Sequence, residues 1–185
     1  FVTRNQSAII AFKVSRKDYS GFHIAASHSD SPTLKIKESS EMNVENQYVK
    51  LNVEKYGGML CAPWFDRPLS VAGRIIVKDG NRLTTKLINV DRDLLMIPNL
   101  AIHMNREVND GYKYNIQKDM LPLYRMSNSG KAFKEMIAEE AGVSVDQIKG
   151  MDLFLYNRME GTIWGCDGEF ISAPRLDDLQ CAFTS

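Results

Sequence analysis

The sequence contains few cysteines and few histidines for its length. Its 185 residues include three histidines and three cysteines, Cys61, Cys166 and Cys181. The cysteines are odd in number and lack CxxC spacing, which argues against a disulfide framework and fits a reducing compartment. We therefore expect a cytoplasmic protein. Because the sequence opens at Phe1 without a methionine, we expect any targeting signal to lie outside it.

Long apolar runs and a net charge are also absent. The most apolar stretch, residues 94–104, is interrupted by Pro98 and His103 and is well short of the roughly 20 residues that cross a bilayer. Lysine plus arginine and aspartate plus glutamate number 23 each, so the formal net charge is zero. We therefore expect neither a membrane span nor a nucleic-acid partner.

The composition itself is that of a soluble globular chain. Hydrophobic residues make up 44% and charged residues 25% of the sequence, close to the averages for such proteins. A chain of this length predicts one good-sized domain, or one domain with parts of another.

The hydrophobic pattern predicts a β-rich chain with one clear helix. Residues 8–14 and 22–26 are β-rich apolar runs that predict a hairpin of two buried strands. Residues 34–37, 48–53, 71–78 and 151–156 predict further strands of an antiparallel sheet. Apolar residues four apart predict an amphipathic helix over residues 129–141, which Gly142 would end.

His28 and Asp30 form an HxD pair that directly follows an apolar run. Residues two apart on a strand point the same way, so the two side chains could act together. His28 could bind zinc through a neutral imidazole, with Asp30 fixing its tautomer or lying near a catalytic water. A loop histidine held by a nearby carboxylate is the alternative, and a motif this short favours that alternative when taken alone.

Asp177 and Asp178 are adjacent carboxylates in front of an apolar stretch that predicts a helix. Acidic residues are common in a first helical turn because they oppose the positive end of the helix dipole. A carboxylate here could instead bridge two metal ions about 3.5–4 Å apart. Spacing alone favours a structural role for His103, and we expect His23 and the three cysteines to be structural.

Five blocks of the sequence, taken together and in this order, resemble aspartyl aminopeptidases. They are FVTRN from Phe1, SHSDSP around His28, YGGMLCAPWFDRPLSVAGR from Tyr56, MIPNLAIHMNR from Met96 and EFISAPRLDDL from Glu169. Each block alone is a weak motif, whereas the ordered set spans nearly the whole chain. The resemblance to this family of two-zinc aminopeptidases overturns the structural interpretations of His28, Asp177 and His103.

The resemblance implies an α/β zinc-exopeptidase catalytic domain, present in part, with an inserted β-rich dimerisation domain that makes up most of the chain. Residues 1–32 and 170–185 would belong to the catalytic domain and residues 33–169 to the insert. It also implies a cytosolic homo-oligomer built from dimers, commonly a dodecamer.

The resemblance further implies roles for individual residues. His28 would be a terminal zinc ligand, Asp30 its support, and Asp177 the carboxylate that bridges the two zinc ions. Asp178 stands where the family usually has asparagine, which leaves open which aspartate binds metal. His103 would be presented to the active site, commonly of a neighbouring subunit, to hold the substrate or the oxyanion; it is also a candidate metal ligand.

The implied reaction is removal of single N-terminal residues, with Asp or Glu as one possible preference, from peptides by metal-activated water. Zinc is the implied cofactor, and another divalent metal could replace it. The family's glutamate pair, a further acidic ligand and a last histidine would lie beyond Ser185, since the pair Glu139–Glu140 lies upstream of Asp177. We therefore expect these residues alone to be inactive. The alternative is a non-catalytic homo-oligomerisation module.

Overall fold

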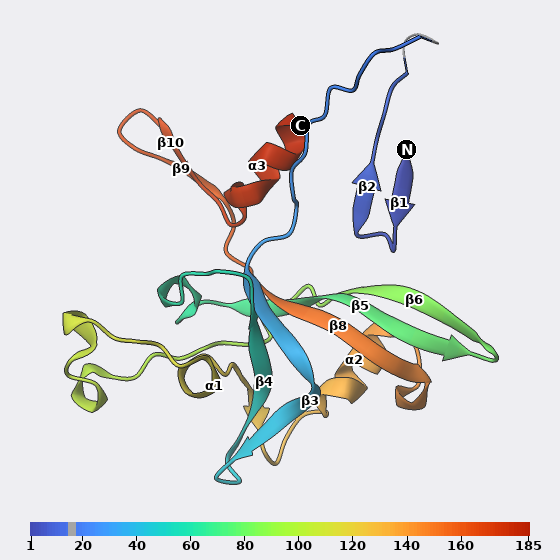
Figure 1. The fold of residues 1–185 in the computed structure, drawn as a ribbon. Coiled ribbons are helices and arrows are strands. Elements are labelled where there is room, and N and C mark those ends of the chain that lie inside the picture. The colour runs from blue at the N-terminus through green and yellow to red at the C-terminus, as the bar shows by residue number, and fades with distance from the viewer. Residues whose placement is uncertain (15–17) are drawn as a thin grey trace.

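The central feature of the protein is a six-stranded antiparallel sheet (Figure 1). The computed structural model describes residues 1–14 and 18–185. The strand order in the sheet is β6-β5-β8-β3-β4-β7. The strands are β3 (Thr33–Val44), β4 (Tyr48–Tyr56), β5 (Leu69–Asp79), β6 (Arg82–Asn89), β7 (Leu123–Met126) and β8 (Ile148–Asn157). The predicted strands at 34–37, 48–53, 71–78 and 151–156 all lie within these strands and are confirmed.

Short helices connect and cover the strands. The α-helices of this region are α1 (Ile116–Asp119) and α2 (Phe133–Ala141), and the 3-10 helices are η1 (Ala62–Trp64), η2 (Ile102–Met104), η3 (Val108–Asp110) and η4 (Val145–Gln147). The predicted helix over residues 129–141 is confirmed, although it begins at Phe133. The Glu41 side chain accepts a hydrogen bond from the Phe133 backbone N–H at 2.8 Å, which satisfies a donor at this helix start. Gly142 ends the helix in the left-handed conformation.

One face of the sheet carries the hydrophobic core. Alternate residues of β3 and β4, such as Leu34, Ile36, Leu51 and Val53, are buried, as expected for a sheet with one covered face. Helix α2 contributes Phe133, Met136, Ile137 and Ala138 to this core.

A polar cluster is formed by residues of β3, β5 and β8 that stand next to buried core residues in these strands. The Lys35 ammonium lies 3.0 Å from one carboxylate oxygen of Asp152, and Arg74 lies 3.3 Å from the other. The Arg74 guanidinium also donates to the backbone carbonyl of Asn5, at 3.0 Å, and so ties the N-terminal hairpin to the sheet.

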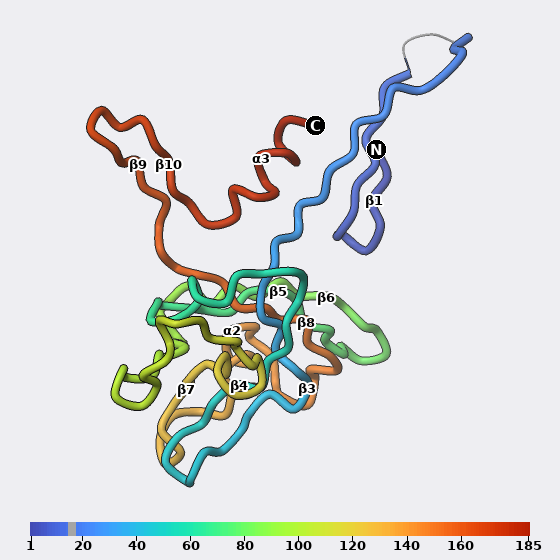
Figure 2. Tube along the Cα trace, turned by 60° about the vertical axis from the view of Figure 1, so that its left-hand side comes forward, coloured from blue at the N-terminus to red at the C-terminus, as the bar shows by residue number. Residues whose placement is uncertain are grey.

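Both ends of the chain lie on one side of this sheet (Figures 1 and 2). The elements there are two hairpins, β1 (Val2–Arg4) with β2 (Ala8–Ile10) and β9 (Thr162–Trp164) with β10 (Phe170–Ser172), and the helix α3 (Leu176–Thr184). The segment that leads into β3 runs beside α3, so residues far apart in sequence meet above the sheet.

The predicted buried hairpin of residues 8–14 and 22–26 is wrong. β2 covers only Ala8–Ile10, and its partner is β1 rather than residues 22–26, which form no strand. Phe12, Phe22 and Ile24 are exposed. The apolar composition identifies residues able to form strands, but these side chains enter no core: Phe22 packs only edge-on against Tyr19 and stays exposed, and an isolated two-stranded hairpin is marginal.

Gly73 provides a test of the close β5–β8 pairing. Its φ is +151°, and a Cβ there would lie 2.2 Å from the Asp152 carbonyl oxygen. We expect Gly73→Ala to lower the free energy of unfolding by about 3 kcal/mol, through strain and overpacking. Gly80→Ala is the control, because Gly80 also has positive φ but has open space around it; its cost should be about 1 kcal/mol. Chemical denaturation measures both, and equal losses would contradict the pairing.

Candidate metal centre

His28, Asp177 and Asp178 come together although about 150 residues separate them in sequence. One potential ligand atom from each lies within 4.8 Å of the other two. His28 lies in the segment that precedes β3, and the two aspartates lie in the first turn of α3. The Ser31 hydroxyl donates to the Asp177 carbonyl at 3.4 Å, which links the two segments.

The two ring nitrogens of His28 have different surroundings. Nδ1 lies 3.0 Å from the Asp30 carbonyl oxygen and 3.2 Å from Asp30 Oδ1. Both neighbours are acceptors, so Nδ1 carries the proton in this arrangement. In a neutral imidazole Nε2 then has the free lone pair, and it points at Asp178, with 3.0 Å between Nε2 and Oδ2.

Asp178 has a buried carboxylate oxygen without a donor. Its side chain is 8% exposed, and no hydrogen-bond donor among residues 1–14 and 18–185 reaches Oδ2. Its 3.0 Å approach to His28 Nε2 lacks hydrogen-bond geometry, and the two groups attract each other as ions only when His28 is protonated. A buried carboxylate oxygen without a partner is costly. A cation shared with Nε2 would satisfy it, and histidine and carboxylate are ligands that zinc accepts, so these residues fit a zinc ion.

The charges and hydrogen bonds of the site shift the pKa values of three side chains in or beside it. The hydrogen bond to the Asp30 carbonyl, together with the negative charges of Asp178 and Asp30, raises the pKa of His28 above its ordinary value. The hydrogen bond from Tyr56 lowers the pKa of Asp30. The Asp178 carboxylate raises the pKa of the Cys181 thiol. Each direction reflects the negative charge that the aspartates bring to the site or the donors that stabilise it.

The structure brings together only some of the residues that the sequence singles out. His28, Asp30 and Asp177 are in or beside the cluster, and Asp178, whose role the sequence leaves open, is the aspartate that faces His28. His23 lies in an exposed segment outside the cluster. Tyr56 begins one of the five sequence blocks, but the sequence assigned it no role at the site; its hydroxyl donates to Asp30 Oδ2 at 2.6 Å.

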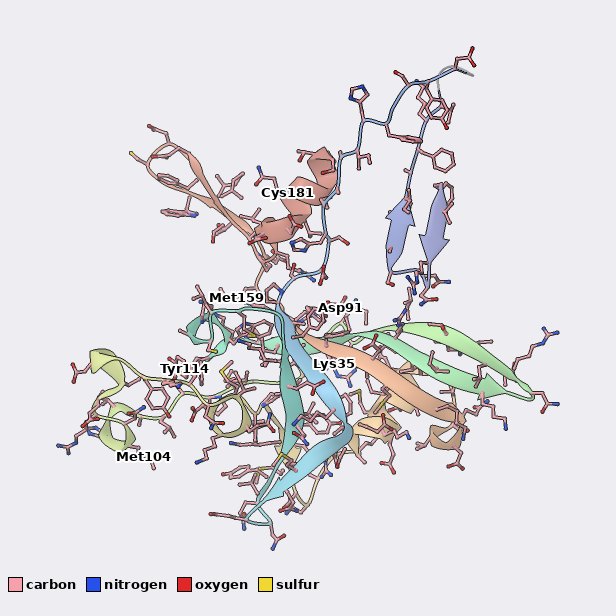
Figure 3. All side chains as sticks on the ribbon, in the orientation of Figure 1. Lys35, Asp91, Met104, Tyr114, Met159 and Cys181 are labelled. Carbon is pink, nitrogen blue, oxygen red and sulfur yellow. The ribbon has the colours of Figure 1, made fainter. Side chains whose placement is uncertain are left out.

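His103 lies in η2, away from the cluster. Its neighbour Met104 lies far from the α3 residue Cys181, at the lower left of the view while Cys181 lies near the top (Figure 3). Asp66 anchors the segment that leads into η2. Its two carboxylate oxygens accept hydrogen bonds from the Asn99 backbone N–H at 2.9 Å and from the Asn99 side-chain amide at 3.0 Å. Within one copy of the chain, His103 therefore does not meet His28.

A comparison with protein families gives a match over the whole chain. A family model described as aminopeptidase I zinc metalloprotease (M18) matches residues 1–185. The chain belongs to the M18 family of zinc metalloproteases.

The curated relatives that this chain matches are longer than the chain. A probable M18 family aminopeptidase 2 of Clostridium acetobutylicum is 50% identical over 189 residues, which cover 97% of this chain and 43% of the relative. A protein of the same name from Pseudomonas paraeruginosa is 37% identical, with 97% and 43% covered. The chain thus spans less than half the length of these relatives.

Solved structures share the fold. The chain matches one in the cryo-EM structure of the Ape4 and Nbr1 complex with a TM-score of 0.77 and 31% identity, over 84% of this chain and 34% of that one. It matches the mApe1 dodecamer of S. cerevisiae with a TM-score of 0.67 and 27% identity, over 85% and 36%. No helix in the described part of the chain is long and apolar enough to cross a membrane.

The raised pKa of His28 gives a pH prediction for the metal-free protein. A folded-state pKa above the ordinary 6.5 means that protonated His28 stabilises the fold below that pH, and that this stabilisation is lost as pH rises through the raised pKa. Asp178→Asn removes one negative charge and should lower the pKa of His28, while the contact with the Asp30 carbonyl remains. NMR titration of the imidazole measures this, with Asp146→Asn in η4 as the distant control. An unchanged pKa in Asp178→Asn would show that the two side chains do not meet.

Proposed function

We propose that the chain is part of a zinc aminopeptidase that removes single N-terminal residues from peptides, and that His28 and the Asp177–Asp178 pair hold its metal. One observation carries the proposal: His28 Nε2 faces the buried, partnerless Oδ2 of Asp178, with Asp177 beside it, among the residues that the structure describes. The family supplies the reaction class.

The chain's own residues would bind and orient the metal. His28 would bind through Nε2 while Asp30 holds the proton on Nδ1, the arrangement that a metal-binding histidine needs. Asp177 would bridge two ions and Asp178 would bind or stabilise one of them. When bound, zinc would polarise the scissile carbonyl and activate the attacking water.

These residues do not complete a catalytic site. Catalytic zinc takes three protein ligands and keeps one open position, and a second ion would need ligands of its own. A general base must also take the proton of the attacking water, and each residue in the cluster is already assigned to the metal. We propose that the remaining ligands and the base come from the longer protein, and that residues 1–185 alone are inactive.

The domain boundaries are also a proposal. Residues 1–32 and 170–185 would form part of an α/β catalytic domain, and residues 33–169 an inserted dimerisation domain. In support, the six-stranded sheet begins at Thr33 and ends at Asn157, while the cluster is built from the segments before and after it.

Assembly is the second candidate function, because η2 and its flanking residues expose apolar side chains. Leu100, Ile102 and Met104 are 58%, 47% and 76% exposed. In a homo-oligomer of dimers, such as a dodecamer, these side chains would be covered and His103 could reach the site of a neighbouring copy. There it would hold the peptide or the oxyanion, or bind metal. In support, one of the matching structures is a dodecamer, that of S. cerevisiae mApe1.

The experiment uses the full-length protein that contains these residues, loaded with zinc. The buffer is kept reducing because the three cysteines are free thiols. We expect His28→Ala and Asp177→Asn to bind less zinc and to lose at least about a hundredfold in kcat/KM, since even outer residues of metal sites cost 10–100-fold. His23→Ala is the control. Peptides with N-terminal Asp, Glu and Leu test whether an acidic N-terminal residue is preferred.

Each outcome tests one part of the proposal. Zinc content that is unchanged in His28→Ala would overturn the metal centre. A full-length protein that binds zinc and assembles but cleaves none of the peptides would favour the assembly module. Peptide cleavage by the isolated 185 residues would overturn the proposal that they are inactive alone.

A further inference from the structure

The register of two strands places Tyr56 beside the metal-site loop. Strands β3 and β4 pair so that Thr33, the first residue of β3, lies opposite Tyr56, the last residue of β4. Asp30 precedes Thr33 by three residues, so the end of β4 and the HxD pair necessarily lie near each other. The Tyr56 hydroxyl spans the remaining gap and donates to Asp30 Oδ2 at 2.6 Å.

Tyr56 is held in this position from two sides. Its ring packs edge-on against Phe154 of β8, with 5.6 Å between the ring centroids. The next residue, Gly57, has a φ of +76°, and a Cβ there would touch Pro32 at 3.4 Å. The turn that follows β4 therefore lies close to the segment that leads from Asp30 into β3, and this close approach keeps the hydroxyl within reach of Asp30.

Tyr56 and His28 bind the two oxygens of one carboxylate. Asp30 Oδ2 accepts from the Tyr56 hydroxyl, and Asp30 Oδ1 lies 3.2 Å from His28 Nδ1. With both oxygens engaged, the Asp30 carboxylate cannot rotate without losing a hydrogen bond, and the imidazole of His28 cannot rotate without losing its contact with Asp30. Because His28 is 65% exposed, packing alone does not hold its ring.

We propose that Tyr56 is a positioning residue for the metal site, which acts through Asp30 to hold His28 Nε2 toward the metal. This inference rests on the proposed zinc-binding role of His28. It adds that the zinc affinity of His28 depends on the hydroxyl of Tyr56, the last residue of β4 in the six-stranded sheet. The two parts of the chain that meet at the site would then be coupled by a hydrogen bond as well as by a peptide link.

The experiment compares Tyr56→Phe with Tyr48→Phe in the full-length protein. Tyr48 lies at the other end of the same strand and is similarly exposed, 43% against 40% for Tyr56, so it is a matched control. Each change removes only a hydroxyl. We expect Tyr56→Phe to weaken zinc binding by about tenfold, the lower end of the range for outer residues of metal sites, and Tyr48→Phe to leave it unchanged. Equilibrium competition with a chelator measures the affinity.

A double-mutant cycle tests whether Tyr56 acts through Asp30. If it does, Tyr56→Phe should have almost no effect in a protein that already carries Asp30→Ala, so the two losses should not add. The ¹⁵N shifts of His28 in metal-free protein provide a readout without zinc. They should show less of the tautomer protonated at Nδ1 in Tyr56→Phe than in Tyr48→Phe.

The outcomes distinguish this inference from the proposed function. If His28→Ala loses zinc but Tyr56→Phe keeps wild-type affinity and tautomer, the inference is wrong and the metal centre stands. If the losses of Tyr56→Phe and Asp30→Ala add in full, Tyr56 does not act through Asp30 and the inference is again wrong. If His28→Ala binds zinc as well as wild type does, the proposed metal centre fails first.

Discussion

The pairing of β3 with β4 is the constraint on which the candidate site depends. It fixes Thr33 opposite Tyr56, and this register determines where the polar segment before β3 leaves the sheet. A shift of one residue would turn the buried side chains of β3 toward solvent, so the hydrophobic core keeps the register in place. The position of His28 is therefore set by the apolar residues of the strand that follows it, including Leu34 and Ile36.

His28 lies between a hydrogen-bonded side and a side where an oxygen has no donor. On one side, His28 Nδ1 contacts Asp30, and the other carboxylate oxygen of Asp30 accepts from the Tyr56 hydroxyl. Of the side-chain polar atoms of His28 and Asp30, this leaves His28 Nε2. On the other side, Asp178 buries an oxygen that no donor in the described chain satisfies. The remaining nitrogen and the remaining oxygen lie 3.0 Å apart and face each other. A shared cation would satisfy both, which is why a metal-binding role explains this pairing better than a helix cap does.

Local sequence patterns predicted most of the sheet and its helix, because alternation and four-residue spacing report directly on a covered face. They failed for residues 22–26, where apolar composition indicates strand-forming capacity but not whether a partner surface exists. The resemblance to a family named His28, Asp30 and Asp177. It did not decide for Asp178, since which of two adjacent carboxylates turns inward depends on the backbone at the start of α3. Tyr56 needed the strand register, a long-range property that no local motif contains.

Anomalous diffraction at the zinc edge, from crystals of the zinc-loaded full-length protein, tests the metal centre most directly. The metal-binding role predicts a zinc peak bound by His28 Nε2 and by at least one carboxylate oxygen of the Asp177–Asp178 pair, at about 2.0–2.2 Å. Asp30 should remain on Nδ1. A zinc peak elsewhere, with His28 and Asp178 still in direct contact, would contradict it.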